Sequence, residues 1–434
     1  MPKLPNDRIL AIEYLRSAEL RPDPNNPRTH SKKQVAQIAA SMRAFGVVNP
    51  ILVDEDKVII AGHGRLQATR SLEHEFVPVI RLTGLSQAQR KALRIADNKI
   101  ATNSGWDADL LRQQVIEIQA LEIEFDVQVL GFETAELDLM MTPAPAAVSD
   151  DDSWPETATV ARARLGDIWA LGRHRIGCGD CRDAEFLQAV VGVDTKVDAA
   201  FLDPPFNVSI QNHANVRKSH REFAMASGEM TDPEFIRFLE TTLGACANAS
   251  KDGAVHFVCM DWRHMEHLMR AGEVVYDDLL NLCVWNKSNA GMGSLYRSKH
   301  ELVFVYRAGS AQHYNAVELG RHGRNRTNVW DYSSVNVGGS RRGELKWHPT
   351  VKPTAMVAAA IQDVTKRGEL VLDAFLGSGT TLIAAERAGR ACRGIEIDPA
   401  YVDIAIERWE AVTGLEAELI DRAAGVDRDA EIAA

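Results

Sequence analysis

The tetrapeptide Asp203-Pro204-Pro205-Phe206, which follows the short apolar run AAFL, combines residue types that could act on an amino group. Two consecutive prolines make a stiff turn with bare carbonyl oxygens, so the Asp203 carboxylate and the Pro204 carbonyl would offer two acceptors close together. Such a pair could hold both N–H groups of a planar exocyclic amine and make its nitrogen nucleophilic. Phe206 could stack on a base that has left its helix. A proline-rich turn without chemistry is the alternative.

A second pattern favours a nucleoside cofactor. The apolar run 370–372 leads into Asp373, a turn with Gly377 and Gly379, and then a helix. About twenty residues later, Glu396 lies near the end of a second strand, where an acid can hold ribose hydroxyls. No Gly-Lys-Ser/Thr follows the turn, and Leu382 stands where dinucleotide dehydrogenases have a third glycine. A phosphate-loop NTPase and a dinucleotide dehydrogenase are therefore both disfavoured.

Three segments, in this order, resemble the motifs of the β-class DNA amino-methyltransferases: Asp203-Pro-Pro-Phe, His348-Pro-Thr-Val-Lys-Pro and Asp373-Ala-Phe-Leu-Gly-Ser-Gly-Thr-Thr. These enzymes methylate N6 of adenine or N4 of cytosine with S-adenosylmethionine (SAM). The resemblance spans roughly 165–412. It implies an α/β, Rossmann-like methyltransferase sheet that is circularly permuted, because the catalytic motif precedes the cofactor motif.

The resemblance also implies roles for individual residues. Asp203 and Pro204 would accept the target amino hydrogens, and Phe206, where relatives often have Tyr, would stack on the base. Asp rather than Ser at position 203 favours adenine, and N4-cytosine methylation is the alternative. The catalytic set is Asp203, Pro204, Pro205 and Phe206. The cofactor set is Asp180, Thr350, Lys352, Asp373, Phe375, Gly377, Gly379 and Glu396.

The segment 287–347 reverses the charge of the chain. It contains ten Lys or Arg and four Asp or Glu residues, a net +6 in a chain of formal charge −11. Such a reversal is typical of contact with nucleic-acid phosphates, so we predict a target-recognition insertion here; a solvated basic loop is the alternative. The predicted DNA-binding residues are Arg321, Arg324, Arg326, Arg341 and Arg342.

The chain divides at a Pro-, Ala- and Asp-rich linker, 141–160, into units of 1–140 and 161–425. The first unit is predicted to be mixed α/β. Strands are expected at 9–15 and 76–82, a hairpin at 50–60, and helices at 34–45, 87–100 and 107–120. The turn Gly62-His63-Gly64-Arg65 opens a further helix and could bind phosphate through Gly62, Gly64 and Arg65. A tight strand-to-helix turn is the alternative.

Residues 5–100 resemble the N-terminal domain of the ParB/sulfiredoxin-like superfamily, through Asn26-Pro27-Arg28, the hairpin and the sequence GHGRLQA. In ParB proteins the equivalent box binds a cytidine triphosphate. Here Gly64 replaces an expected Arg and His63 an expected acid. The unit has no Cys, which excludes the redox repair of sulfiredoxins. The resemblance implies that this unit binds a nucleotide or DNA.

Composition limits the remaining possibilities. A charge of −11 excludes a uniformly basic coat, and six Cys in 434 residues are too few for a disulfide scaffold. Cys178 and Cys181 lack two further ligands, so no metal site is predicted. We find no signal peptide and no apolar run near the ~18 residues of a membrane span, so the protein is expected in the cytoplasm and away from membranes.

The predicted partners are double-stranded DNA, a nucleotide at the first unit and a second copy of the chain. The predicted function is site-specific adenine-N6 methylation of DNA, as in restriction-modification systems. A DNA-binding module whose second half only senses SAM is a further alternative, as is a methyltransferase acting on RNA or protein.

Overall fold

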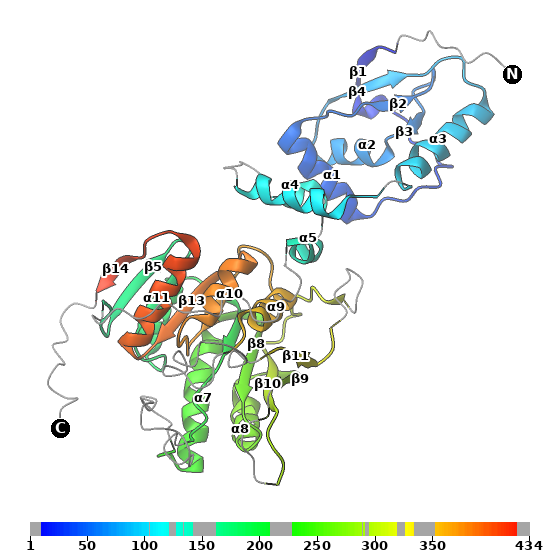
Figure 1. Ribbon diagram of the computed structural model, residues 1–434. Coiled ribbons are helices and arrows are strands. Elements are labelled where there is room, and N and C mark those ends of the chain that lie inside the picture. Colours follow the sequence, from blue (N-terminus) through cyan, green and yellow to red (C-terminus); the bar gives the residue numbers. More distant parts are fainter. Residues whose placement is uncertain are drawn as a thin grey trace. The chain divides into compact units, whose positions relative to one another are not determined.

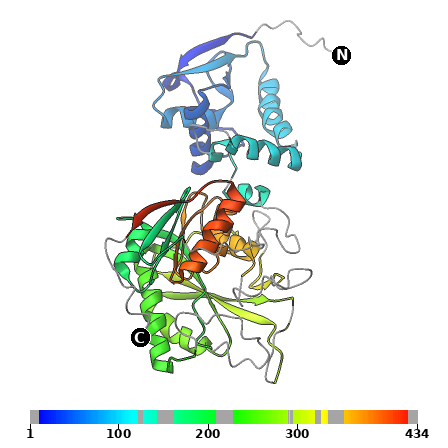
Figure 2. The same ribbon diagram turned by 60° about the vertical axis from the view of Figure 1, so that its left-hand side comes forward.

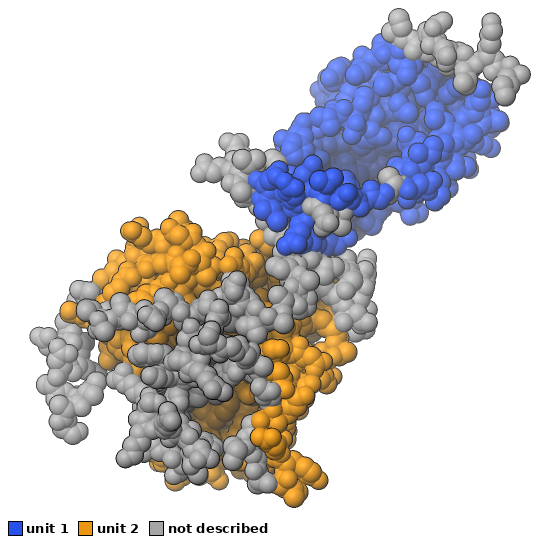
Figure 3. Space-filling model, viewed as in Figure 1, with its two compact units in different colours: residues 1–141 blue, residues 142–434 orange. Residues whose placement is uncertain are grey.

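The computed structural model describes residues 10–103, 105–120, 127–132, 134–141, 162–208, 228–288, 290, 295–318, 326–333 and 352–422. The chain forms two compact units, 1–141 and 142–434 (Figures 1 and 3). Of the predicted linker, only Met141 is described, as the last residue of a helix. Among the described residues, no helix has both the length and the apolar character needed to cross a lipid bilayer.

The first unit has a four-stranded sheet in the order β1-β4-β2-β3. Its strands are β1 (Ile12–Arg16), β2 (Ile51–Val53), β3 (Ile59–Ala61) and β4 (Phe76–Arg81). β2 and β3 are antiparallel neighbours, which confirms the predicted hairpin. Branched side chains from β2, β3 and β4 fill the core, because they pack well on a pleated surface.

Five α-helices accompany this sheet in the described part of the unit. They are α1 (Lys32–Phe45), α2 (His63–Ser71), α3 (Gln87–Ala101), α4 (Ala108–Ala120) and α5 (Thr134–Met141). Ser31 caps α1 by accepting from the Gln34 amide, and Ser86 forms a full capping box with Gln89 at α3. The helices predicted at 34–45, 87–100 and 107–120 are confirmed. Short 3₁₀ turns lie at Ser17–Glu19 and Val127–Leu130.

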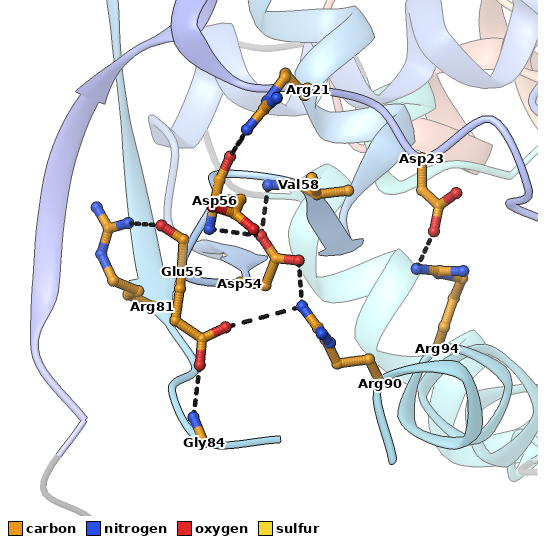
Figure 4. Close-up of polar contacts among 10 residues, drawn as sticks. All are labelled: Arg21, Asp23, Asp54, Glu55, Asp56, Val58, Arg81, Gly84, Arg90 and Arg94. Atoms are coloured by element: carbon orange, nitrogen blue, oxygen red, sulfur yellow. Dashed lines mark hydrogen bonds and ion pairs between the residues drawn. The ribbon is translucent and has the colours of Figure 1, made fainter. Parts of the chain in front are cut away.

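A polar network fastens the hairpin turn to α3 (Figure 4). One oxygen of buried Asp54 accepts from the Asp56 and Val58 amides, at 3.0 and 2.8 Å. The other oxygen accepts from Arg90 on α3 at 2.7 Å. The Glu55 carboxylate accepts from the Gly84 amide at 2.6 Å. The acidic run at this turn therefore organises the turn itself.

The second unit has a ten-stranded mixed sheet in the order β11-β9-β10-β8-β7-β12-β13-β6-β5-β14. The five strands from β8 to β6 run parallel. The strands are β5 (Asp167–Leu171), β6 (His174–Cys178), β7 (Val197–Leu202), β8 (Ser250–Met260), β9 (Asp278–Asn286), β10 (His300–Ala308), β11 (Val329–Asp331), β12 (Leu370–Asp373), β13 (Ala391–Glu396) and β14 (Glu418–Arg422).

Helices cover both faces of this sheet (Figures 1 and 2). One core contains side chains of α6 (Ala184–Val191), α7 (Asp232–Asn248) and α8 (Met265–Val275). The other contains side chains of α9 (Thr354–Val364), α10 (Thr380–Ala388) and α11 (Pro399–Thr413). At the carboxyl end of β7, Ala200 and Leu202 lie in the first core and Phe201 in the second, because both faces of the strand are buried there. This doubly wound arrangement confirms the predicted Rossmann-like α/β class.

The structure corrects the extent of the predicted recognition insertion at 287–347. Within this segment, β10 pairs with β8 on one side and β9 on the other, inside the sheet. Its run from Leu302 to Tyr306 is buried and apolar, as expected for an interior strand. Residues 300–308 therefore belong to the central sheet.

Candidate active site at the ends of four parallel strands

Four neighbouring parallel strands carry an acidic residue at or just beyond their carboxyl ends. Asp203 follows β7, Asp373 ends β12, Glu396 ends β13, and Asp180 lies two residues after β6. These strands are adjacent in the order β7-β12-β13-β6, and neighbouring strands lie ~4.8 Å apart. The four residues therefore share the edge at which open α/β sheets bind their ligands.

The turn between β12 and α10 places backbone at this edge. Gly377 and Gly379 have φ of +52° and +86°, a left-handed conformation that favours glycine. A Cβ on Gly379 would lie 2.9 Å from the Ala405 Cβ of α11, so the turn and α11 pack without room for a side chain. Buried Arg408 of α11 donates to the Ser378 carbonyl at 2.8 Å and thereby fixes the turn against α11.

Two acids at this edge, buried Asp373 and partly buried Glu396, are easily protonated. Glu396 accepts from the Gly377 amide at 2.8 Å and from the Asp398 amide at 2.9 Å, yet burial raises its pKa to about 7. Burial also raises the pKa of Asp373 to about 7, and the charges of Asp203 and Glu396 add to the effect. No neighbouring cation offsets the desolvation of either carboxylate, so a positively charged ligand would stabilise the ionised form of both acids.

Asp180 lies at the same edge of the sheet, in the turn that follows β6. The Gly179 amide donates to the Glu396 carbonyl at 2.9 Å, which fixes the turn that holds Asp180 beside β13. The Asp180 carboxylate is paired with Arg182 at 2.6 Å. Phe375 is partly buried in the turn after β12, with its ring centroid 6.4 Å from that of Phe238.

Asp203 is one end of a chain of four alternating charges. Its Oδ2 lies 2.7 Å from Lys352 Nζ, and Lys352 Nζ lies 2.6 Å from Glu301 Oε1. Glu301 Oε2 in turn lies 2.7 Å from Lys287 Nζ. Lys352 and Glu301 are buried, while Lys287 is about one quarter exposed, at 26% of its side chain.

The two oxygens of Asp203 differ. Oδ2 accepts from Lys352, whereas Oδ1 is buried and has no hydrogen-bond partner among the described residues. Burial raises the pKa of Asp203, and Lys352 only partly offsets this effect. Phe206 lies beside the pair, with its ring centroid 5.8 Å from Lys352 Nζ. The arrangement leaves Oδ1 as one strong acceptor that is shielded from water, directly before the Pro204-Pro205 turn in the sequence.

Asp203, Cys259 and Glu301 have potential ligand atoms within 4.8 Å of one another. The ammonium of Lys352 contacts both carboxylates, so a protein cation already occupies the place where a metal ion would be held. Cys178 and Cys181 are buried free thiols, and burial raises the pKa of Cys181 to about 12. A protonated thiol is a poor metal ligand.

Some predicted site residues have other contacts or are not described. Arg326 forms an ion pair with Asp363 at 2.8 Å and lies over the Trp330 ring, so its contact with DNA stays a prediction. Arg321, Arg324, Arg341, Arg342 and Thr350 lie outside the described residues. Conversely, the sequence assigned no role to Glu301 or Lys287.

The glycine turn of the first unit is tightly packed. Gly62 precedes α2 with φ of +105°, and a Cβ on Gly64 would lie 3.0 Å from His30 Nδ1. Arg65 donates to the Pro50 carbonyl at 2.9 Å, and partial burial of its guanidinium lowers its pKa. These contacts favour the tight strand-to-helix turn, and phosphate binding at Gly62, Gly64 and Arg65 stays a prediction.

Comparison with known proteins identifies both units. Residues 197–407 match the N6/N4 family of DNA methylases, and residues 5–98 match the ParB N-terminal domain. The ParB-like nuclease domain-containing protein YnaK of Escherichia coli K12 is 49% identical over 82 residues, which cover 19% of this chain and 94% of YnaK. Type II methyltransferase M.HpaI of Haemophilus parainfluenzae is 22% identical over 232 residues, which cover 50% of this chain and 69% of that enzyme.

Among solved structures, the M1.HpyAVI–SAM complex is 20% identical, with a TM-score of 0.40, over 54% of this chain and 97% of that chain. The family matches and the YnaK relative place the two units in known families. The chain therefore joins a ParB N-terminal domain to a DNA methylase domain of the N6/N4 family.

Proposed function

We propose that this protein transfers the methyl group of SAM to the N6 amino group of adenine in DNA. The observation that carries the proposal is the buried Oδ1 of Asp203, which has no hydrogen-bond partner among the described residues and lies at the strand edge shared with the Gly377–Gly379 turn. Asp203 lies within residues 197–407, which match the DNA methylase family, and an acceptor of this kind would suit an amino group to be methylated.

The residues at the strand edge suit SAM, which carries an ammonium, a sulfonium and a ribose. Buried Asp373 and partly buried Glu396 have raised pKa values and no compensating cation, so a cationic ligand would favour their ionised forms. Asp373 would hold the ammonium and Glu396 the ribose hydroxyls, against the backbone of the glycine turn. Bound there, the cofactor supplies an electrophilic methyl group.

The chain's own residues would then act on the amino group. Asp203 Oδ1 and the Pro204 carbonyl would each accept one N–H, which localises the nitrogen lone pair toward the methyl donor. Phe206 would stack on the base that has left the duplex, which offsets part of the few kcal/mol that base flipping costs. Asp203 would take the proton that the nitrogen releases once it is methylated, so no covalent enzyme intermediate forms.

The choice of adenine rests on the resemblance at position 203, where Asp stands in place of Ser. N4-cytosine methylation is the second candidate, because the matched family covers both bases. The two products are distinct nucleosides, which makes the choice directly measurable.

The test uses the full-length protein, unmethylated plasmid and labelled SAM, followed by digestion of the DNA to nucleosides and mass spectrometry. We expect N6-methyldeoxyadenosine. N4-methyldeoxycytidine would contradict the adenine assignment and keep DNA methylation. Parallel reactions with RNA and with protein extract as acceptors should stay unlabelled. If DNA, RNA and protein all remained unlabelled, the result would point to a domain that only senses SAM.

SAM affinity should rise with pH across neutrality. The pKa values of Asp373 and Glu396 are both about 7, so at pH 5.5 both acids are mainly neutral and at pH 7.5 mainly ionised. Only the ionised Asp373 attracts the ammonium of SAM, so the dissociation constant should fall by up to about tenfold per pH unit below pH 7. Isothermal titration between pH 5.5 and 7.5 measures this.

The Asp373→Asn variant is the control for this pH effect. It should bind SAM more weakly and with a much flatter pH dependence. A wild-type affinity that is constant over this range would contradict the role given to Asp373.

A further inference from the structure

We propose that Glu301 and Lys287 are positioning residues of the methyl transfer. Together with Lys352 they orient the Asp203 carboxylate. Its Oδ2 then accepts a hydrogen bond from Lys352, and its Oδ1 stays available to accept one from the substrate amino group. This inference rests on the proposed function. It assigns roles to one side chain on β10 and one directly after β9, outside the three sequence motifs.

The sheet itself brings the chain of charges together. β10 lies between β8 and β9, and β8 lies next to β7, whose end carries Asp203. Glu301 is the second residue of β10 and is paired in register with Trp285. Lys287 follows β9, and its amide donates to the Lys299 carbonyl at 2.8 Å, which extends the β9–β10 ladder by one residue. Strand register therefore sets the distance between Lys287 and Glu301.

The charges alternate and balance. The order is Lys287, Glu301, Lys352, Asp203, with successive contacts of 2.7, 2.6 and 2.7 Å. A buried Lys352 with Asp203 as its only partner would be free to bind both oxygens of that carboxylate. Glu301 also attracts the Lys352 ammonium, so the ammonium is shared between Glu301 and Asp203 Oδ2. Lys287 in turn neutralises Glu301, so that a second buried carboxylate is tolerated.

An aromatic surface confines both ammonium groups. The Trp285 ring lies 4.6 Å from Lys287 Nζ and 6.0 Å from Lys352 Nζ. Buried Trp285 donates its indole N–H to the Tyr332 carbonyl at 3.0 Å, which fixes the ring. The lysines therefore have little freedom to move along the chain of charges.

A network that served stability alone would be expected to satisfy its buried acceptors. Leaving one unsatisfied costs about 1–3 kcal/mol, and such groups are rare in folded proteins. Asp203 Oδ1 is unsatisfied although Lys352 lies within reach of the same carboxylate. The network directs the lysine to Oδ2, which is the arrangement a site needs before its substrate arrives.

Charge changes at the two residues should act on Asp203 in opposite directions. The negative charge of Glu301 raises the pKa of Asp203, whereas Lys287 lowers it. If Asp203 must be ionised for transfer, Glu301→Gln should move the acid limb of the rate–pH profile to lower pH. Lys287→Met should move it to higher pH.

The experiment measures single-turnover methyl transfer to DNA over a range of pH, SAM affinity and thermal unfolding for wild type, Glu301→Gln and Lys287→Met. We expect transfer rates to fall roughly 10- to 100-fold, because small displacements of a reacting group have effects of this size. SAM affinity should stay within about threefold, since Asp373 and Glu396 are untouched. Lys251→Met is the matched control, because it removes a lysine from an exposed ion pair with Asp198 on the same sheet. That control should keep the wild-type rate and profile.

The outcomes separate the inference from the function on which it rests. Wild-type rates and unshifted acid limbs in both variants would overturn the positioning roles alone. A wild type that methylates no DNA would overturn the proposed function and this inference with it. If Glu301→Gln does not fold, Lys287→Met decides the question, because Lys287 lies at the partly exposed end of the network.

Discussion

Asp203→Ala is expected to lower the rate constant of methyl transfer by at least about 1000-fold while SAM affinity changes less than about threefold. The substitution removes the acceptor for one amino hydrogen and the group that takes the released proton. Losing a single preorganised acceptor or a general base each costs about 100-fold or more. The residues proposed to hold SAM lie on β12 and β13 and keep their contacts.

Asp203→Asn separates charge from shape. It keeps the volume of the side chain, but an amide cannot take a proton and carries no charge to pair with Lys352. We therefore expect a loss of rate close to that of Asp203→Ala, measured in the same single-turnover assay with tritiated SAM. A rate within tenfold of wild type in either variant would remove Asp203 from the chemistry.

The cofactor half of the site could be predicted from sequence because its parts are local. Strand, glycine turn, helix and acid follow one another within a short stretch, and each strand end places its acid at the same edge of the sheet. The left-handed glycines at 377 and 379 occur where the spacing predicted them. The functional roles of these residues stay predictions that the variants above address.

The network behind Asp203 could not be predicted in the same way. Glu301 and Lys287 approach Asp203 only because β10 and β9 are stacked beside β8 and β7, and strand order is not encoded by any local pattern. The short segments Trp285-Asn286-Lys287 and His300-Glu301 do resemble blocks of the methyltransferase family. That signal gives no distance and no partner, and a role in the core was equally compatible with it.

The excess of basic residues in 287–347 predicted a single DNA-reading insertion, yet several of these residues are paired with acidic side chains. Lys287 pairs with Glu301, Arg307 with Asp278, and Arg326 with Asp363. A net charge summed over a segment cannot distinguish such pairs from an exposed basic surface. Arg65 of the first unit is similar, because its local context suits a phosphate and its actual partner is the carbonyl of Pro50.

Gly379→Ala is expected to weaken SAM binding at least about tenfold and to lower the unfolding temperature of the methylase domain. Two costs combine at this position. A left-handed φ of +86° costs a residue with a Cβ about 1–2 kcal/mol. The new Cβ would also lie 2.9 Å from the Ala405 Cβ and 3.2 Å from its Cα, so α11 or the turn must move, which costs typically about 1–3 kcal/mol.

Gly368→Ala distinguishes these two costs. Gly368 also has a left-handed φ, +81°, but a Cβ there would have no atom within 4 Å. This control should therefore show the backbone cost alone, with near-normal SAM affinity. Titration with SAM and thermal unfolding of both variants make the comparison. If the two variants bound SAM equally well, the close packing of the glycine turn against α11 would have no part in forming the cofactor site. The cofactor would then have to bind elsewhere on the strand edge than at Gly377 and Gly379.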